Sequence, residues 1–282
     1  MMVPVQGQIA IQSWSMVVQR SHGVQFINSC LMIIDLYVNN SIYLDSKVKI
    51  ILSLDNTHCT QIFDTTVEKI IEAGQEGLAI EMDLMDRKSV LNAADTAYDH
   101  FGRIDVLLNN AIYQGPGAML TVEQLDDHHV KQLFEGNVFS QLALTRHLLP
   151  RFIEQGGATV INMISATAFT NPPGKIGSGG WGVGYAMTKA AFERLAPLLM
   201  IEHGEDGIIT YNIDPGHVVT ERQRAKQKDK EYTAFPSAPP EAIGAAIAWL
   251  VNEPSAPEEY GGKIVNAQRE TKRRNLLPGW PE

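Results

Sequence analysis

Tyr185 and Lys189 are the two residues whose types and spacing most directly indicate chemistry. They are four positions apart in "GYAMTKAAFERLAPLLMIEHG" (184–204), which has the hydrophobic pattern of a helix. Both side chains are therefore expected on one face of that helix. A nearby ammonium group favours the ionised form of a phenol and lowers its pKa from the usual value of about 10. The pair predicts a tyrosine that exchanges a proton near neutral pH.

Polar residues also follow three predicted strands. Ser165 lies at the end of the strand expected at 157–166, "LLNNA" (107–111) ends another, and "DPGHVVT" (214–220) follows a third. Open α/β sheets bind their ligands at the carboxyl ends of parallel strands. These residues are therefore expected to meet at one crevice.

The elements that must position these residues alternate between strand and helix from residue 47 onward. This alternation predicts an α/β fold with a parallel sheet covered on both faces. The predicted strands are 47–54, 77–84, 104–111, 157–166, 207–216 and 261–268, and the predicted helices are 64–74, 86–102, 121–155 with a break near Gly136, 184–204 and 240–252.

Taken in order, these motifs resemble those of the short-chain dehydrogenase/reductase family. The matching motifs are Asn109-Asn110-Ala111-Ile112, Asn137, Ser165, Tyr185 with Lys189, and Pro215-Gly216 with Thr220. The resemblance covers residues 47–267 and implies a single domain with a Rossmann-like, doubly wound parallel sheet. Residues 1–46 are then an atypical N-terminal segment, and 268–282 a C-terminal tail.

The resemblance also implies roles for individual residues. Tyr185 would be the general acid and base, and Lys189 would hold the nicotinamide ribose. Ser165 would orient the substrate oxygen, and Asn137 would hold a water molecule behind Lys189. The positions implied to contact the cofactor are Asp55, Asp83, Leu84, Asn109, Asn110, Ala111, Tyr185, Lys189, Pro215, Gly216, Val218 and Thr220.

The implied cofactor is NAD or NADP. Asp55 follows the run "KVKIILSL" (47–54), where an acidic residue would bind the ribose hydroxyls, and this favours NAD.

The insert 170–184 contains Gly177, Gly179 and Gly182, which match the spacing G-x-G-x-x-G. A dinucleotide fingerprint needs a strand, a tight turn and a helix in one compact unit. Here the nearest predicted strand ends near Ser165, more than ten residues earlier. We interpret the insert as a glycine-rich, mobile substrate loop, and an ordinary surface insertion is the alternative.

The N-terminal segment departs from the family. Residues 1–46 contain only two glycines and no T-G-x-x-x-G-x-G turn. The run "LMIIDLYV" (31–38) is too close to Lys47 for a parallel crossover, so it is expected to pair antiparallel or to pack elsewhere. The first βα unit is therefore missing or replaced. Three explanations stay open: an incorrectly assigned first exon, a variant that binds cofactor weakly or not at all, or a segment that rebuilds the site.

Composition excludes several classes of protein. The net charge of −9 argues against nucleic-acid binding, and the apolar run 26–38 is too short to span a membrane. Cys30 and Cys59 have no metal or redox spacing, which favours a cytoplasmic location. "DDHH" (126–129) is interpreted as a solvated face and not a metal site. The basic residues of 269–274 are interpreted as part of a solvated extension.

Two functions remain. The first is an NAD(P)-dependent oxidoreductase that interconverts a small secondary alcohol and a ketone, as a homodimer or homotetramer. The alternative is a cofactor-deficient relative that acts as a binding or scaffold protein. The intact Asn, Ser, Tyr and Lys favour the first, and the absent glycine-rich turn favours the second.

Overall fold

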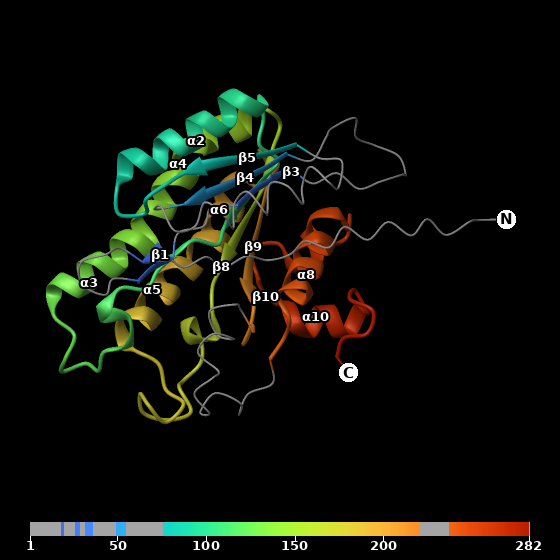
Figure 1. The fold of residues 1–282 in the computed structure, drawn as a ribbon. Coiled ribbons are helices and arrows are strands. Elements are labelled where there is room, and N and C mark those ends of the chain that lie inside the picture. The colour runs from blue at the N-terminus through green and yellow to red at the C-terminus, as the bar shows by residue number, and fades with distance from the viewer. Residues whose placement is uncertain are drawn as a thin grey trace.

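A seven-stranded sheet forms the centre of the molecule (Figure 1). The computed structural model describes residues 18–19, 26–28, 32–35, 49–54, 76–219 and 237–281. The strand order is β10-β9-β8-β6-β3-β4-β5, and all neighbours are parallel except at β3. The strands are β3 (Met32–Asp35), β4 (Lys49–Leu54), β5 (Glu76–Glu81), β6 (Val106–Asn109), β8 (Ala158–Met163), β9 (Ile208–Asp214) and β10 (Ile264–Asn266).

Helices cover both faces of this sheet, as predicted. On β6, Leu107 faces a core cluster formed with α2 (Arg87–Phe101), α4 (Ser140–Glu154) and α6 (Leu195–His203). Val106 and Leu108 face the opposite cluster, which is formed with α8 (Pro240–Asn252). This alternation buries both faces of the strand and confirms the Rossmann-like α/β fold.

Strand β3 takes the place of the missing first strand. It lies between β4 and β6 and runs antiparallel to both, with Ile33 opposite Ile51 and Leu107. Antiparallel pairing and packing elsewhere were the two expectations for 31–38, and the described part, Met32–Asp35, pairs antiparallel. The predicted helix 64–74 lies outside the described residues.

A second, small antiparallel sheet has the order β1-β2-β7. Its strands are β1 (Val18–Gln19), β2 (Phe26–Asn28) and β7 (Ile112–Tyr113). β7 directly follows the Asn-Asn-Ala motif, at the position where the family motif has glycine and this chain has Ile112.

The helix predicted at 121–155 is divided into three parts. α3 (Asp127–Phe134) begins where Asp126 accepts a hydrogen bond from His129 N–H. A π-helical turn, η2 (Glu135–Phe139), then leads into α4 without a break. Gly136 lies in this turn, and glycine is required there because a Cβ would be 2.4 Å from the Cβ of Tyr113.

The single helix predicted at 184–204 is wrong in detail, because it divides into α5 (Val183–Glu193) and α6. Pro197 has no N–H to donate to the carbonyl of Glu193. The side-chain amide of Asn212 donates to that carbonyl instead, at 2.7 Å.

The prediction of a solvated C-terminal extension is also wrong. After the short helix α9 (Ala256–Tyr260) and β10, the chain forms α10 (Ala267–Arg274), which packs against α8. Glu270 and Thr271 of α10 are buried, and the Thr271 hydroxyl donates to the Ala242 carbonyl at 2.6 Å. Among the described helices, none is long and apolar enough to cross a bilayer.

Candidate active site

Ser165, Tyr185 and Lys189 meet at the carboxyl edge of β8. Ser165 follows β8 by two residues, and its hydroxyl caps the short helix η3 (Ala166–Ala168) by accepting from Thr167 N–H at 3.3 Å. Tyr185 and Lys189 lie one turn apart on α5, so the arrangement predicted from the sequence brings these three residues together.

The hydroxyl of Tyr185 faces the hydroxyl of Ser165. Burial raises the pKa of Tyr185 to about 12, the Ser165 hydroxyl opposes this shift, and the carboxylate of Asp214 adds to it. The prediction of a lowered pKa is therefore wrong for this arrangement. The unfavourable free energy of removing the phenolate from water is larger than the stabilisation that the Ser165 hydroxyl gives it.

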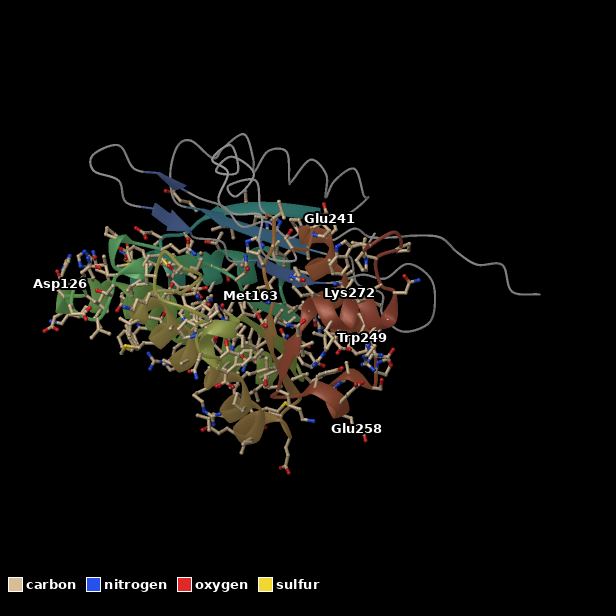
Figure 2. All side chains as sticks on the ribbon, turned by 90° about the horizontal axis from the view of Figure 1, so that it is seen from below. Asp126, Met163, Glu241, Trp249, Glu258 and Lys272 are labelled. Carbon is tan, nitrogen blue, oxygen red and sulfur yellow. The ribbon has the colours of Figure 1, made fainter. Side chains whose placement is uncertain are left out.

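Lys189 is directed toward the backbone of β8. Its Nζ donates to the carbonyl oxygen of Met163 at 2.6 Å, and the residue is 4% exposed. Burial lowers its pKa from 10.5 to about 7. Met163, labelled in Figure 2, is the last residue of β8. A buried amine that titrates near neutral pH therefore lies at the strand end next to Ser165.

Asn137 lies in the π-helical turn η2, and its side chain is bonded in both directions to the backbone of Tyr113. Its Oδ1 accepts from Tyr113 N–H at 2.6 Å, and its Nδ2 donates to Tyr113 O at 3.0 Å and to the Thr188 hydroxyl at 3.4 Å. π-Helical turns are frequent at functional sites. Asn137 thus connects strand β7 to the face of α5 next to Lys189.

The turn after β9 brings Pro215, Gly216 and Val218 to the same edge. Asp214, 5% exposed, accepts at Oδ1 from Ala166 N–H and from Gly216 N–H, each at 3.1 Å. Ala166 is the residue after Ser165, so this carboxylate joins two strand ends. Thr220 lies outside the described residues.

The expected adenosine side is built differently from the prediction. Asn109 is 1% exposed, and its amide donates to Asn162 Oδ1 and to the Thr145 hydroxyl inside the protein. The side chains of Leu84 and Ala111 are also buried. A cofactor could therefore meet these three positions only through the backbone.

Two more positions of that side have polar groups near the surface. Asp83 follows β5, and its Oδ1 accepts from Met85 N–H at 2.8 Å. Asn110 is half-buried next to β6. Asp55 lies outside the described residues.

The other half of the site has hydroxyls from Ser165 and Tyr185, the amine of Lys189 and the turn at Gly216. These groups suit the nicotinamide half of a dinucleotide.

The glycines of the insert serve close packing and turns. Gly177 and Gly179 have φ of +84° and +88°, in a turn where Ser178 N–H bonds to Lys175 O at 2.8 Å. A Cβ on Gly182 would be 2.1 Å from the carbonyl oxygen of Ala118. No strand directly precedes them, as predicted, so they do not form a strand–turn–helix phosphate loop.

Sequence reasoning missed two residues that shape this edge. Asp214 appears in the sequence only as part of a polar strand end, and nothing in the sequence around Gln268 indicates a role for it. Gln268, at the start of α10, donates to Pro215 O and to His217 O, each at 2.9 Å. The contacts of Gln268 are with residues more than 50 positions earlier in the chain, and no local sequence pattern predicts such contacts.

The fold is that of known Rossmann-like oxidoreductases. A 7α-hydroxysteroid dehydrogenase complexed with NADH and 7-oxo glycochenodeoxycholic acid superimposes with a TM-score of 0.62 at 22% identity, covering 77% of this chain and 81% of that one. A 3-oxoacyl (acyl-carrier-protein) reductase from Agrobacterium tumefaciens with NADP bound has a TM-score of 0.66 at 19% identity, covering 77% and 82%.

Sequence comparison identifies the family. The model of the short chain dehydrogenase family matches residues 44–231. Glucose 1-dehydrogenase 2 of Bacillus subtilis is 26% identical over 67% of this chain and 73% of its own length. NADPH-dependent aldehyde reductase 1 of Arabidopsis thaliana is 30% identical over 59% of this chain, which spans only 54% of that enzyme. The chain belongs to the short-chain dehydrogenase family of oxidoreductases.

Proposed function

We propose that this chain is an NAD(P)-dependent oxidoreductase that interconverts a secondary alcohol and a ketone through Ser165, Tyr185, Lys189 and Asn137. The observation that carries the proposal is that Tyr185 and Ser165 lie close enough for the Ser165 hydroxyl to lower the pKa of the phenol, with Lys189 one turn further along α5.

Tyr185 is the proton-transferring residue. In the reduction direction its hydroxyl gives a proton to the substrate oxygen, and in the oxidation direction its phenolate takes the proton back. Ser165 donates a hydrogen bond to the same oxygen and fixes its position. A nicotinamide cofactor held beside these residues would supply or accept the hydride at the substrate carbon.

Lys189 and Asn137 act behind Tyr185. An amine with a pKa of about 7 can pass a proton without a large energetic cost at neutral pH. Lys189 would also hold the ribose of the cofactor. Asn137 fixes the backbone of Tyr113 next to α5, and a water held there would connect Lys189 to solvent.

The choice between NAD and NADP rests on Asp55, which would bind the ribose hydroxyls, and NAD is favoured. The adenosine half would meet Asp83 and Asn110, and the nicotinamide half would meet the turn of Pro215, Gly216 and Val218. The cytoplasmic location stays a prediction.

Titration with NADH and with NADPH, followed by nicotinamide fluorescence, tests cofactor binding. We expect saturable binding of one or both by the folded chain. If neither binds, the enzyme assignment of this chain fails, and the alternative of a binding or scaffold protein is favoured.

Replacement of Tyr185 by Phe tests the proton transfer. We expect Tyr185→Phe to lower turnover by about 10²–10⁴-fold with cofactor affinity nearly unchanged, because one hydroxyl is lost from the reacting centre. Tyr211→Phe is the matched control, since the Tyr211 hydroxyl is buried in the core without a hydrogen-bond partner. Turnover retained by Tyr185→Phe would remove Tyr185 from the mechanism.

A further inference from the structure

The side-chain amide of Gln268 bridges two carbonyl groups of the turn after β9. Its Nε2 donates to Pro215 O and to His217 O, each at 2.9 Å. These two carbonyls flank Gly216. The two N–H groups of one side-chain amide therefore bind both sides of the turn.

A second contact from the same segment holds the start of the turn. Asn266, the last residue of β10, donates from Nδ2 to Asp214 Oδ2 at 3.1 Å. The other oxygen of Asp214 accepts from Gly216 N–H and from Ala166 N–H. The segment from Asn266 to Gln268 thus fixes the turn relative to the backbone that follows Ser165.

The amide of Gln268 can approach the turn this closely because residue 216 is glycine. Gly216 has φ of +63°, and a Cβ on it would be 2.6 Å from Nε2 of Gln268. A side chain at position 216 would therefore displace the amide of Gln268.

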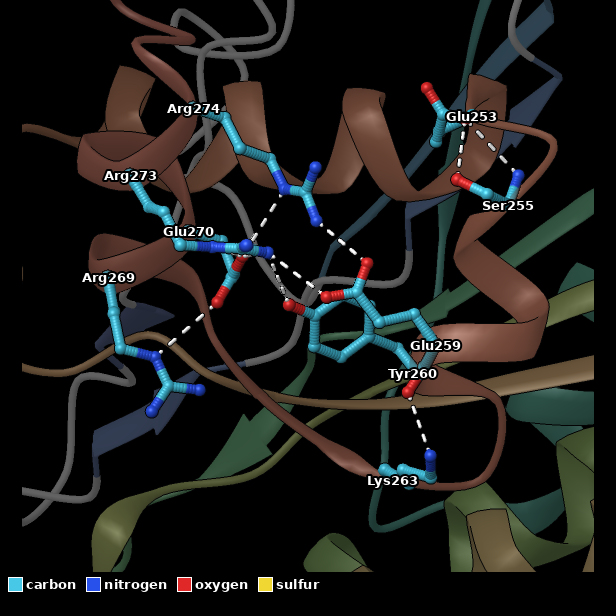
Figure 3. A network of polar contacts seen from close by, with 9 residues as sticks. All are labelled: Glu253, Ser255, Glu259, Tyr260, Lys263, Arg269, Glu270, Arg273 and Arg274. Atoms are coloured by element: carbon cyan, nitrogen blue, oxygen red, sulfur yellow. Dashed lines mark hydrogen bonds and ion pairs between the residues drawn. The ribbon is translucent and has the colours of Figure 1, made fainter.

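Helix α10 gives Gln268 a fixed base. Figure 3 shows Glu270 at the centre of a network of ion pairs. Its Oε2 accepts from Arg273 at 2.7 Å and from Arg274 at 3.3 Å, and both arginines also pair with Glu259 of α9. Arg274 stacks on Trp249 of α8 with 3.6 Å between the guanidinium carbon and the ring centroid. Within this network the Glu270 carboxylate is buried, whereas Arg273 and Glu259 are about half exposed.

We infer that Gln268 is a positioning residue that holds the turn 215–218 in the form that binds the nicotinamide end of the cofactor. This inference rests on the proposed function for the identity of the ligand. The contacts that hold the turn do not depend on the proposed function.

The first test measures the turn without any cofactor. In Gln268→Glu the donor is replaced by a carboxylate that faces two carbonyl oxygens, so we expect hydrogen exchange of a peptide covering 214–219 to become at least about 10-fold faster. Gln268→Met, which removes the donor at similar volume, should behave in the same direction and serves if the charged variant does not fold.

Gln155 offers a matched control just before β8, at the amino ends of the parallel strands. Its Nε2 also bridges two carbonyls, Ile104 O at 2.7 Å and Gly157 O at 3.0 Å. Gln155→Glu should lower thermal stability to a similar degree and leave exchange in 214–219 unchanged.

The second test measures the cofactor. We expect Gln268→Glu to raise the Kd of the cofactor by at least about 10-fold while kcat at saturation changes less than about 3-fold, and Gln155→Glu to change neither. Unchanged exchange in the Gln268 variants would overturn the inference, as would faster exchange with unchanged Kd. If the native chain binds no cofactor, the proposed function and the ligand part of the inference both fail, and exchange alone decides whether Gln268 holds the turn.

Discussion

At the scale of single residues, Lys189 makes the stability of the protein depend on pH. Its pKa is about 7 in the folded chain and 10.5 when exposed, so the unfolded chain binds more protons between these values. The free energy of unfolding therefore rises with pH across this window. Each pKa unit is about 1.4 kcal/mol, so the stability lost by burying the charged amine at low pH is on the order of 5 kcal/mol.

Lys189→Met should remove this dependence. We expect the variant to be more stable than the native chain at pH 6 and the difference to shrink toward pH 10, as measured by urea unfolding. The exposed Lys263 provides the control, and Lys263→Met should show no such trend. A difference that does not vary with pH would mean that Lys189 stays charged in the folded protein.

Burial is the main cause of the raised pKa of Tyr185, and the negative charge of Asp214 raises it further. Asp214→Asn keeps an oxygen for the N–H groups of Ala166 and Gly216 but removes the charge. We expect the rise of alcohol oxidation with pH to move to lower pH, by about 1 unit or less. A rate–pH profile measures this, with the exposed Asp206→Asn as control. A midpoint that stays or moves upward would contradict the electrostatic role.

At the scale of secondary-structure elements, Gly182 decides how closely α5 approaches η1 (Pro116–Met119). The Cβ of Gly182→Ala would lie 2.1 Å from the carbonyl oxygen of Ala118 and 2.7 Å from the Cα of Met119, which are both backbone atoms. We expect a loss of about 1–3 kcal/mol of stability and a lower kcat, because the start of α5 carries Tyr185.

Gly156→Ala separates this packing effect from conformational strain. Gly156 has φ of +91°, and a Cβ at this position would have no atom within 4 Å, so its replacement strains the backbone without a clash. It should cost about 1–2 kcal/mol in thermal unfolding and leave kcat unchanged. An equal loss of kcat in both variants would show that the approach of α5 to η1 does not matter for the site.

Local signals predicted several elements well. Asp86 accepts from Lys88 N–H at the start of α2, and Gly102 ends that helix with φ of +77°, both at the predicted boundaries. The proximity of Ser165 to Tyr185 followed from the rule that parallel strands end at one edge. In each case the information lies within a few residues of sequence or in a general rule of topology.

Long-range contacts could not be predicted in this way. The raised pKa of Tyr185 depends on burial by distant segments, and the course of α10 depends on pairing Glu270 with Arg273 and Arg274. The central place of β3 depends on its register with β4 and β6. A basic segment in isolation has the composition of a solvated tail, whereas the helix α10 also depends on the Asn266 cap, on packing against α8 and on the buried Glu270.

At the scale of the whole molecule, apolar side chains remain exposed on helices of one face of the sheet. Leu142 of α4 is 40% exposed, and Leu198 and Ile201 of α6 are 47% and 80% exposed. Exposed apolar side chains gathered on neighbouring helices are typical of contact surfaces, so we predict that these side chains contact a second copy of the chain.

Light scattering after size exclusion tests this assembly. The native chain is expected as a homodimer or homotetramer, and Leu142→Glu combined with Leu198→Glu should shift it to the monomer, because two charges cannot be buried unpaired. Val122→Glu is the control, since Val122 is 73% exposed outside these helices. A native chain that is monomeric at micromolar concentration would contradict the prediction.

The four residues of β3 have a consequence for the cooperativity of unfolding. In the part of the chain that the structure describes, they supply the only ladders between the β4–β5 pair and the four strands from β6 to β10. Opening this one short strand would separate the β4–β5 pair from the rest of the sheet, and the packing of α2 against α4 would then be the main remaining contact between the two parts. Ser165, Tyr185 and Asp214 lie beside β8 and β9. Local unfolding of β4 and β5 would therefore displace Asp83, on the expected adenosine side, before it displaced the proton-transfer residues.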